Sequence, residues 1–495
     1  MIRRISILLL CLSLLLPCIP AYATNTVAKD ITASATFSGT GYKSLDFLHD
    51  GSTGTYRTSG DTASITLEDP DGIGGLYLLF DLEYGPYTVT DNVTGQQRTA
   101  GTHGFLHDYL TFPATTSVTL DFADGPVRLS EIYVLSPGDA PDFVQHWQAP
   151  LEGETDLLLL STHGDDDQLF FAGLLPLYAA ERQAAVQVVY LTDHRNLTNA
   201  RTHEILNGLW AVGVTAYPVM GSFHDFRIDD LEESYDHFED TGASREDLLA
   251  FVVEQLRRFK PQVVVGHDIN GEYGHGMHMV YTDCLIKALD IAPDASQFKT
   301  LAHKYGTWDV PKTYLHLYEE NEIRMDYDQP LTAFDGMTAF EVSQKLGYPC
   351  HKSQQYTWFT RWINGSNNEI TKATQIKTYS PCDFGLYRST VGSDEAKNDF
   401  LENLTLYADQ LPPEPPTEPP TEPPTGPPVE VPAGPTTTPD TTPPTDPPTE
   451  APTTTPTEAP TPLPPRPVPT LPFLLLGILV VLLVVTLSLL SKRRR

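Results

Sequence analysis

The sequence predicts two folded domains, an all-β domain followed by an α/β domain with a Rossmann-like parallel sheet and helices on both faces. Two observations predict this order. Up to about residue 148, short runs rich in Thr, Val, Tyr and Phe are separated by Gly, Asp and Pro, with no helical period. From Leu151 onward, apolar runs typical of buried strands alternate with stretches of helical periodicity.

Residues 1–23 have the three regions of a secretory signal peptide. Two arginines precede an apolar run from Ile5 to Ile19, and Ala21-Tyr22-Ala23 supplies small residues at a cleavage site. We therefore expect export of the chain, with Thr24 as the first residue after cleavage.

Residues 24–148 are predicted to form a β-sandwich of the jelly-roll type. Residues 31–36 and 47–58 resemble the opening of discoidin-like (F5/8 type C) carbohydrate-binding domains, and this resemblance implies glycan binding. A β-domain that only packs against its neighbour is the alternative. The predicted strands are Leu76 to Phe80, Thr88 to Thr90, Ser117 to Phe122 and Leu129 to Leu135.

Residues 149–408 are predicted to form the α/β domain. Behind Ser244, a good N-cap, five apolar residues lie on one face of a helix. They are Leu248, Leu249, Val252, Val253 and Leu256. In open parallel sheets the ligand site lies outside the carboxyl ends of the strands, so residues that follow strands are candidates for chemistry. The predicted strands are Leu157 to Ser161, Val186 to Leu191, Val214 to Val219 and Gln262 to Gly266.

Two histidine-bearing loops follow strands of this sheet. The first is Thr162-His-Gly-Asp-Asp-Asp-Gln168, in which three adjacent carboxylates repel one another unless a cation is present. A plain Asp-rich turn is the alternative. In the second loop, His275 and His278 are three apart in what should be a first helical turn, so both can face one point. Together the loops predict one metal site.

The cysteines make no metal-binding pattern. Those after the signal peptide are Cys284, Cys350 and Cys382, and a Cys350–Cys382 disulfide is the simplest pairing. Any metal must therefore use imidazoles and carboxylates. Catalytic zinc takes three protein ligands and leaves a position for water, so the surplus histidines and aspartates would carry out the proton transfers.

Four motifs in order resemble the LmbE/PIG-L family of zinc-dependent sugar de-N-acetylases across residues ~150–405. Thr162 to Asp167 resembles the family's Ala-His-Pro-Asp-Asp-Glu signature, and Gly274 to His278 resembles its Gly-His-Pro-Asp-His loop. Arg201-Thr-His-Glu204 resembles an Arg-x-x-Glu helix, and His351-Lys-Ser-Gln354 resembles a late His-x-Ser-Gln segment. The resemblance implies an LmbE-like fold and one Zn²⁺ per chain.

The resemblance also implies roles for individual residues. Zinc ligands would be His163, Asp166 and His278, and Asp165 would be the general base that activates the metal-bound water. His275 would polarise the acetyl carbonyl or protonate the amine. The implied substrate-binding residues are Arg201, Glu204, Asp225 and His351, although a surface salt bridge between the first two is an equal interpretation.

Three positions depart from the family pattern. Gly164 replaces Pro, Asp167 replaces Glu, and Gly276-Met277 replaces Pro-Asp in the second loop. The loop aspartate, which we take to be an orienting group, is therefore absent at Met277. Asp268 and Glu272 are the two candidates for a substitute carboxylate.

The C-terminal part predicts a stalk and a membrane anchor. Residues 411–470 are dominated by Pro and Thr, which favours an extended, disordered spacer. Residues 471–490 are an uncharged apolar run long enough for one transmembrane helix, and the basic tail 491–495 would stay cytoplasmic. We expect a secreted chain anchored in the plasma membrane, with its catalytic part outside the cell and the composition of a bacterial surface protein.

The expected function is zinc-dependent removal of N-acetyl groups from N-acetylglucosamine-type sugars of extracellular glycans or glycoconjugates. Two alternatives stay open, a non-catalytic glycan-binding surface adhesin and a metal-dependent hydrolase of another amide or ester. The formal charge of -32 repels phosphate backbones, so we expect no nucleic-acid partner.

Overall fold

The computed structural model describes residues 26–194, 200–354 and 370–410. The chain divides into two units, Met1–Pro415 and Pro416–Arg495. The predicted signal peptide, stalk, membrane helix and basic tail lie outside the described residues. Among the residues that are described, no helix is both long and apolar enough to cross a membrane.

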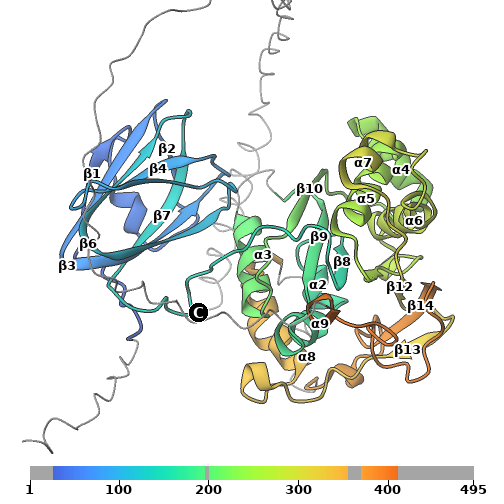
Figure 1. Cartoon of the computed structure of the whole chain (residues 1–495). Helices are drawn as coiled ribbons and strands as arrows, with labels where there is room; N and C mark the ends of the chain where they lie inside the picture. The colour runs from blue at the N-terminus through green and yellow to red at the C-terminus, as the bar shows by residue number, and fades with distance from the viewer. Residues whose placement is uncertain (1–25, 195–199, 355–369, 411–495) are drawn as a thin grey trace, which may run out of the picture. The chain divides into compact units, whose positions relative to one another are not determined.

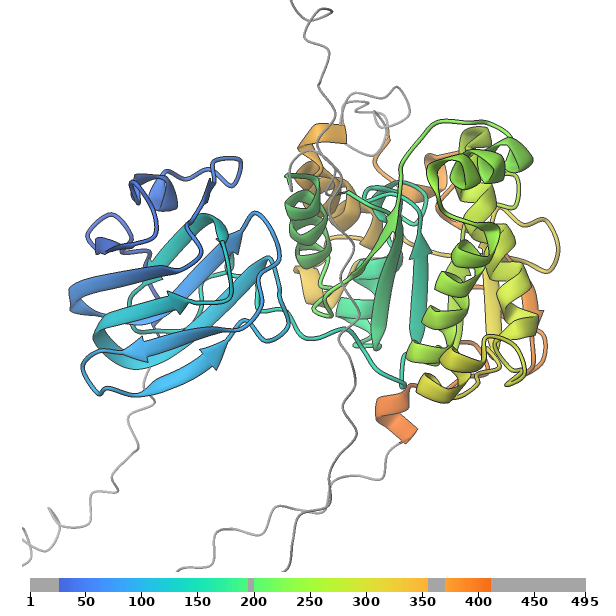
Figure 2. The same ribbon diagram turned by 90° about the horizontal axis from the view of Figure 1, so that it is seen from above.

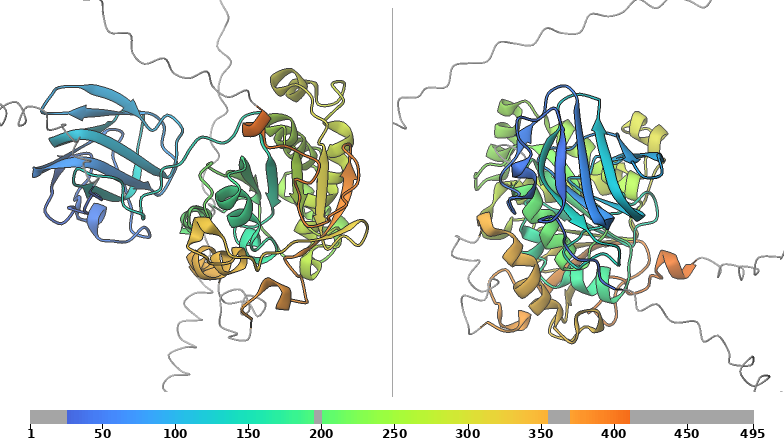
Figure 3. Two further views of the ribbon diagram at one scale, coloured as in Figure 1. Left: turned by 60° about the horizontal axis from the view of Figure 1, so that its bottom comes forward. Right: turned by 90° about the vertical axis from the view of Figure 1, so that its left-hand side faces the viewer.

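The N-terminal part is built from antiparallel strand pairs, whose long strands are seen side by side in the right-hand panel of Figure 3. Its elements are β1 (Thr36–Thr40), η1 (Asp46–His49), β2 (Arg57–Thr58), β3 (Ala63–Phe80), β4 (Tyr87–Asp91), β5 (Gln97–Ala100), β6 (His107–Phe122) and β7 (Arg128–Leu135). The strand order is β2-β7-β3-β6-β4-β5, and β1 pairs with β3.

The strand β3 is longer than the sequence predicts. Its register against β6 shifts between Glu68 and Gly75, around Pro70 and Gly72. Gly72 has a φ of 105°, a conformation that glycine adopts without strain. These turn-forming residues sit in a bulge rather than at a strand end, which is why sequence periodicity detects only the second half of β3.

A buried carboxyl group makes the stability of the β part depend on pH. Glu131 on β7 is 1% exposed, and its Oε1 accepts a hydrogen bond from the Ser52 amide at 2.9 Å. Burial and the neighbouring Asp50 raise the pKa of Glu131 to about 7, from 4.5. The folded state therefore holds this proton more tightly than the unfolded chain does.

We expect this part to lose stability as the pH rises. The contribution of Glu131 is complete below pH 4.5, decreases as the pH rises and is lost through about pH 7. Glu131→Gln should remove most of this dependence, so that the variant is more stable than wild type at pH 8 but not at pH 4.5. Thermal unfolding in buffers containing a chelator measures the effect, with the exposed Asp61→Asn as the control. Identical pH profiles for wild type and Glu131→Gln would contradict it.

The second part is an α/β domain. Its strands are β8 (Leu157–Ser161), β9 (Val186–Thr192), β10 (Val219–Phe223), β11 (Val263–Gly266), β12 (Lys312–His316), β13 (Glu322–Arg324) and β14 (Asp383–Ser389). Its α-helices are α2 (Asp166–Leu169), α3 (Ala200–Ala211), α4 (Leu231–Thr241), α5 (Arg245–Phe259), α6 (Gly276–Ile291), α7 (Lys299–Tyr305), α8 (Ala339–Val342) and α9 (Tyr407–Gln410). Shorter helical turns are η2 (Pro176–Glu181), η3 (Glu272–Gly274), η4 (Thr332–Phe334), η5 (Ser343–Gly347), η6 (Tyr348–Cys350), η7 (Lys352–Gln354) and η9 (Ala373–Gln375).

The sheet order is β10-β9-β8-β11-β12-β14-β13. The five strands from β10 to β12 run parallel, whereas β14 pairs antiparallel with both of its neighbours, β12 and β13. The helices α3 and α8 cover one face and α4 to α7 the other (Figures 1 and 2). Within β8, Leu157 and Leu159 enter one core and Leu158 and Leu160 the other. Burial on both faces explains the unbroken apolar strand, and the predicted α/β fold is confirmed.

The strand predicted at Val214 to Val219 is wrong. The observed strand β10 begins at Val219, directly after Pro218, which lacks the amide hydrogen that a ladder needs. Its centre is Gly221, where a Cβ atom would lie 1.9 Å from the Leu191 carbonyl oxygen of β9. This close backbone approach needs glycine, which the apolar pattern does not favour in a strand.

The predicted disulfide is also wrong, because Cys350 and Cys382 are both free. The thiol of Cys350 donates to the Leu346 carbonyl at 3.3 Å. The side chain of Cys382 is instead buried in the apolar core at the start of β14.

The helix α5 forms as predicted. Ser244 is its N-cap and forms a capping box with Asp247. Its fully buried Arg257 donates hydrogen bonds to carbonyl oxygens at the end of α6 and in the segment after it. The acceptors are Ile291, Ala292, Asp294, Gln297 and Phe298. One guanidinium group therefore satisfies five carbonyls.

We expect Arg257→Met to destabilise the α/β domain by about 2–4 kcal/mol, because buried carbonyl groups lose their donors. The adjacent Arg258 is the matched control, since it pairs at the surface with the exposed Glu152. Arg258→Met should cost about 1 kcal/mol or less. Thermal unfolding of both variants measures the difference. Equal decreases in Tm would show that the hydrogen bonds from Arg257 to the five carbonyls do not contribute more to stability than the surface pair of Arg258.

Candidate active site

The first histidine loop connects β8 to α2. The amide of His163 donates to Asp166 Oδ2 at 2.8 Å, which closes the loop into a tight turn. At Gly164, the side chain of Ile205 from α3 fills the space where a Cβ would lie, with its Cδ1 2.3 Å from that position. This packing accounts for a small residue where the family pattern has Pro.

The second histidine loop connects β11 to α6. His275 is the N-cap of α6, and its Nδ1 accepts a hydrogen bond from the Met277 amide at 3.3 Å. Since that nitrogen is an acceptor, the proton of the neutral ring is on Nε2. The rings of His275 and His278 are stacked, with centroids 4.9 Å apart and planes 9° from parallel. The prediction that both rings share the first turn of a helix is confirmed.

Three side-chain atoms converge between the loops. His163 Nδ1 lies 3.0 Å from Asp166 Oδ2 and 3.2 Å from His278 Nε2, and the last two atoms are 3.3 Å apart. All three residues are buried. Donor atoms about 2.0–2.1 Å from a tetrahedral zinc ion lie about 3.3 Å from one another, so this arrangement fits the size of the ion.

The other ring nitrogen of His163 faces a third segment. Its Nε2 lies 3.3 Å from Oδ1 of Asp225, in the loop after β10. Burial opposes the charged ring, but Asp166 and Asp225 outweigh it and raise the pKa of His163 to about 10. A metal ligand must release this proton, which would make metal binding weaker at low pH.

The two predicted proton-transfer groups have opposite protonation tendencies. Burial raises the pKa of Asp165, and Arg201, whose guanidinium donates to Asp165 Oδ1 at 3.0 Å, limits the rise. Burial and the neighbouring His163 and His278 lower the pKa of His275 to about 2. The carboxylate is therefore a stronger base than a solvated aspartate, and the imidazole is neutral.

The remaining predicted substrate residues are Glu204 and His351. Glu204 accepts hydrogen bonds from the Ser353 amide and hydroxyl, at 3.0 and 2.6 Å. His351 is fully buried against Gly208 of α3, and neither of its ring nitrogens has a hydrogen-bond partner among the described residues. The pairing of Glu204 with Ser353 links the two late motifs to each other.

Two histidines beside the cluster were not among the predicted residues, and the substitute carboxylate was left open between two residues. Of these two, Glu272 contacts the cluster, since its Oε2 accepts from His278 Nδ1 at 2.7 Å. Asp268 instead accepts from Asn270, and Met277 is buried in the apolar core. The missed residues are His267 and His316, which also contact Glu272. Their one sequence signal is that each lies at the carboxyl end of a strand, β11 or β12.

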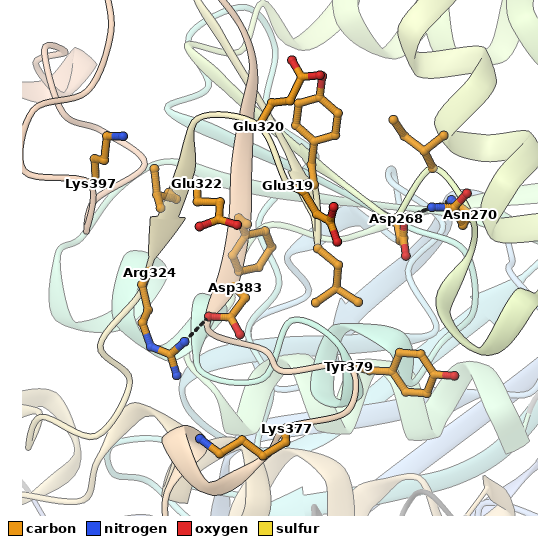
Figure 4. Close-up of a pocket in the computed structure, with 15 residues that line it drawn as sticks. Asp268, Asn270, Glu319, Glu320, Glu322, Arg324, Lys377, Tyr379, Asp383 and Lys397 are labelled. Atoms are coloured by element: carbon orange, nitrogen blue, oxygen red, sulfur yellow. Dashed lines mark hydrogen bonds and ion pairs between the residues drawn. The ribbon is translucent and has the colours of Figure 1, made fainter.

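A cavity of 1110 Å³ lies beside the second loop (Figure 4). Its walls carry more acidic than basic side chains, and Arg324 of β13 pairs with Asp383 of the neighbouring strand β14. Tyr379 lines the cavity, and its ring packs 6.3 Å from that of Tyr273, which in turn contacts His275 and His278. None of the residues of the histidine cluster lines the cavity, so the two are separated by these tyrosines.

Residues 158–289 match the family model described as PIG-L, GlcNAc-PI de-N-acetylase. This part of the chain is similar to the PIG-L family, and we refer to it as the PIG-L domain. It includes both histidine loops and the motif from Arg201 to Glu204, whereas Ser353, the partner of Glu204, lies beyond it.

Curated relatives extend the likeness. A 1D-myo-inositol 2-acetamido-2-deoxy-alpha-D-glucopyranoside deacetylase 1 of Catenulispora acidiphila is 28% identical over 169 residues, which are 33% of this chain and 47% of the relative. The corresponding deacetylase 2 of Saccharopolyspora erythraea is 26% identical over 267 residues, 50% of this chain and 87% of the relative. The chain thus spans about half the length of the first relative.

Among solved structures, the PIG-L domain is similar to an N,N'-diacetylchitobiose deacetylase from Pyrococcus horikoshii. The sequence identity is 15% and the TM-score is 0.33, with 47% of this chain and 82% of the other covered.

Proposed function

We propose that the protein is a metal-dependent deacetylase that hydrolyses the acetamido group of N-acetylglucosamine-type sugars. The observation that carries the proposal is the convergence of His163, Asp166 and His278 beside Asp165 and His275. The family description and the names of the relatives support the reaction and the sugar, because both refer to removal of acetyl groups from acetamido sugars.

The ligand set would be His163, Asp166 and His278, and imidazole and carboxylate donors suit Zn²⁺. A bound zinc ion supplies Lewis acidity for the acetyl carbonyl and lowers the pKa of water. The chain itself would place Asp165 to take a proton from the attacking water, while Arg201 orients this carboxylate.

His275 would face the acetyl carbonyl with its Nε2–H and stabilise the negative charge that develops on the carbonyl oxygen. Water forms the new C–O bond, the C–N bond breaks, and the amine nitrogen leaves with a proton that Asp165 returns. The products are acetate and a free amine, so atoms and charge balance.

Acetate and amine release from a panel of N-acetylglucosamine conjugates tests the proposal, with a chelator in one arm and added zinc in another. We expect release that the chelator abolishes and zinc restores. Release from simple amides or esters alone would instead favour another acyl substrate. Absence of release from every substrate by a zinc-loaded protein would overturn the deacetylase assignment and favour the glycan-binding adhesin.

We also propose that the enzyme acts outside the cell. The signal-peptide pattern of residues 1–23, the spacer of residues 411–470 and the apolar run 471–490 support this location. Protease treatment of intact cells tests it. Loss of the folded part from the intact cells supports the proposal, and full protection contradicts it.

A further inference from the structure

Glu272 joins four segments of the α/β domain at one buried carboxylate. It begins the turn η3, is 0% exposed, and receives hydrogen bonds from three imidazoles and one amide. Its Oε2 accepts from His267 Nδ1 at 2.9 Å and from His278 Nδ1 at 2.7 Å. Its Oε1 accepts from His316 Nδ1 at 2.6 Å and from the Asp268 amide at 3.2 Å. A carboxylate has about four lone-pair sites, so all of them are used.

The tautomer of His267 is determined by its partners. Its Nε2 lies 3.0 Å from the amide nitrogen of Thr162, which can only donate. The nitrogen Nε2 must therefore be the acceptor, and the proton is on Nδ1, where it points to Glu272. Since Thr162 precedes His163, this contact also ties the first histidine loop to the second.

His316 holds the other side of the same carboxylate. Its Nε2 lies 2.9 Å from the Ser380 carbonyl oxygen, which can only accept, and its Nδ1 faces Glu272. Both ring nitrogens therefore donate. His316 therefore ties Glu272 to the segment that contains Ser380.

The contact with Glu272 determines which ring nitrogen of His278 carries the lone pair. With Nδ1–H donated to Glu272, its Nε2 carries a lone pair, and this atom is the one that faces Asp166 Oδ2 and His163 Nδ1. A neutral imidazole in solution interconverts between two tautomers, only one of which presents Nε2 as a ligand atom. Such supporting contacts to a ligand histidine fix both its tautomer and the orientation of its ring.

We propose that Glu272 is a positioning residue that holds His278 with its Nε2 ready for metal, and that His267 and His316 hold Glu272 in turn. This arrangement replaces an orienting carboxylate at position 277, where the side chain is an apolar methionine that points into the core. The proposal rests on the proposed function in one respect, that His278 binds the metal.

Glu272→Gln in the full chain tests the proposal. Glutamine has nearly the same shape, but its amide nitrogen donates, so it cannot accept from both His278 and His316. We expect the Kd for Zn²⁺, measured by competition with a chromophoric chelator, to weaken by about 10–100-fold. The visible absorption of the cobalt-substituted variant should also change, which mere loss of stability would not cause. Glu246→Gln, an exposed carboxylate on α5, is the matched control and should leave both readouts unchanged.

A second measurement needs no metal. In the full chain labelled with ¹⁵N-histidine, treated with chelator and held at a pH at which the ring of His278 is neutral, its nitrogen shifts should show Nδ1 protonated and Nε2 unprotonated. In Glu272→Gln they should show a mixture of tautomers. If that variant does not fold, His316→Gln, which keeps Glu272 but loses one of its donors, should show the same two effects to a smaller degree.

The outcomes separate this inference from the function on which it rests. A zinc Kd within about twofold of wild type, together with wild-type tautomers, would overturn the role of Glu272 whatever the enzyme hydrolyses. Failure of the wild-type chain to bind zinc would overturn the proposed function, and the tautomer measurement would still decide whether Glu272 orients His278.

Discussion

Asp165→Asn is expected to lower kcat by about 10²–10⁴-fold while the protein keeps its metal. Asparagine matches the shape of aspartate but cannot take a proton from water. The predicted metal ligands are unchanged, because Asp166, not Asp165, lies within 3.0–3.3 Å of the two imidazole nitrogens. Activity is measured as acetate release, and metal content is measured on the same dialysed sample.

Asp240→Asn is the control for this prediction. Asp240 is an exposed aspartate on the helix α4. The variant should leave kcat close to that of wild type. Retained activity in Asp165→Asn would show that another group is the base, and loss of the metal in that variant would show that Asp165 is itself a ligand.

His163→Ala is expected to weaken zinc binding by more than about 100-fold and to abolish hydrolysis. The change removes a predicted ligand, so its effect should exceed the 10–100-fold effect of removing a supporting residue. It also leaves Asp166 and Asp225 facing each other without the imidazole that lies between them. Metal content after dialysis and acetate release are the two measurements.

His303→Ala is the matched control for His163→Ala. His303 lies in the last turn of α7, is exposed and has no contact with the cluster among the described residues. Full zinc occupancy in His163→Ala would move the ligand set to the neighbouring group of His267, Glu272 and His278, which does not include His163.

Much of the fold could be predicted because its signals are local. The apolar run of β8 is buried on both faces of the sheet, and the capping box at Ser244 begins α5 where the pattern places it. By contrast, β13 has three residues, two of them charged and exposed, and its pairing with β14 depends on contacts far away in the sequence. Short edge strands leave no periodic signal.

For the candidate site too, some features could be predicted from the sequence and others could not. The amino-acid sequence by itself determined which histidines and aspartates stand at the carboxyl ends of strands β8 and β11, because residue order along a strand fixes its end and parallel strands end at one edge. It also determined that cysteine cannot supply the metal ligands.

Only the tertiary structure decided which ring nitrogen faces which carboxylate. Glu272 was one of two possible substitutes in the sequence, and its contacts to His278 and His316 come from α6 and β12, segments that only folding brings together. The strength of a hydrogen bond is sensitive to changes of a few tenths of an ångström in the donor–acceptor distance and to the direction of the bond. No periodic pattern in a sequence encodes such geometry, because it is the joint result of every element packed around the carboxylate.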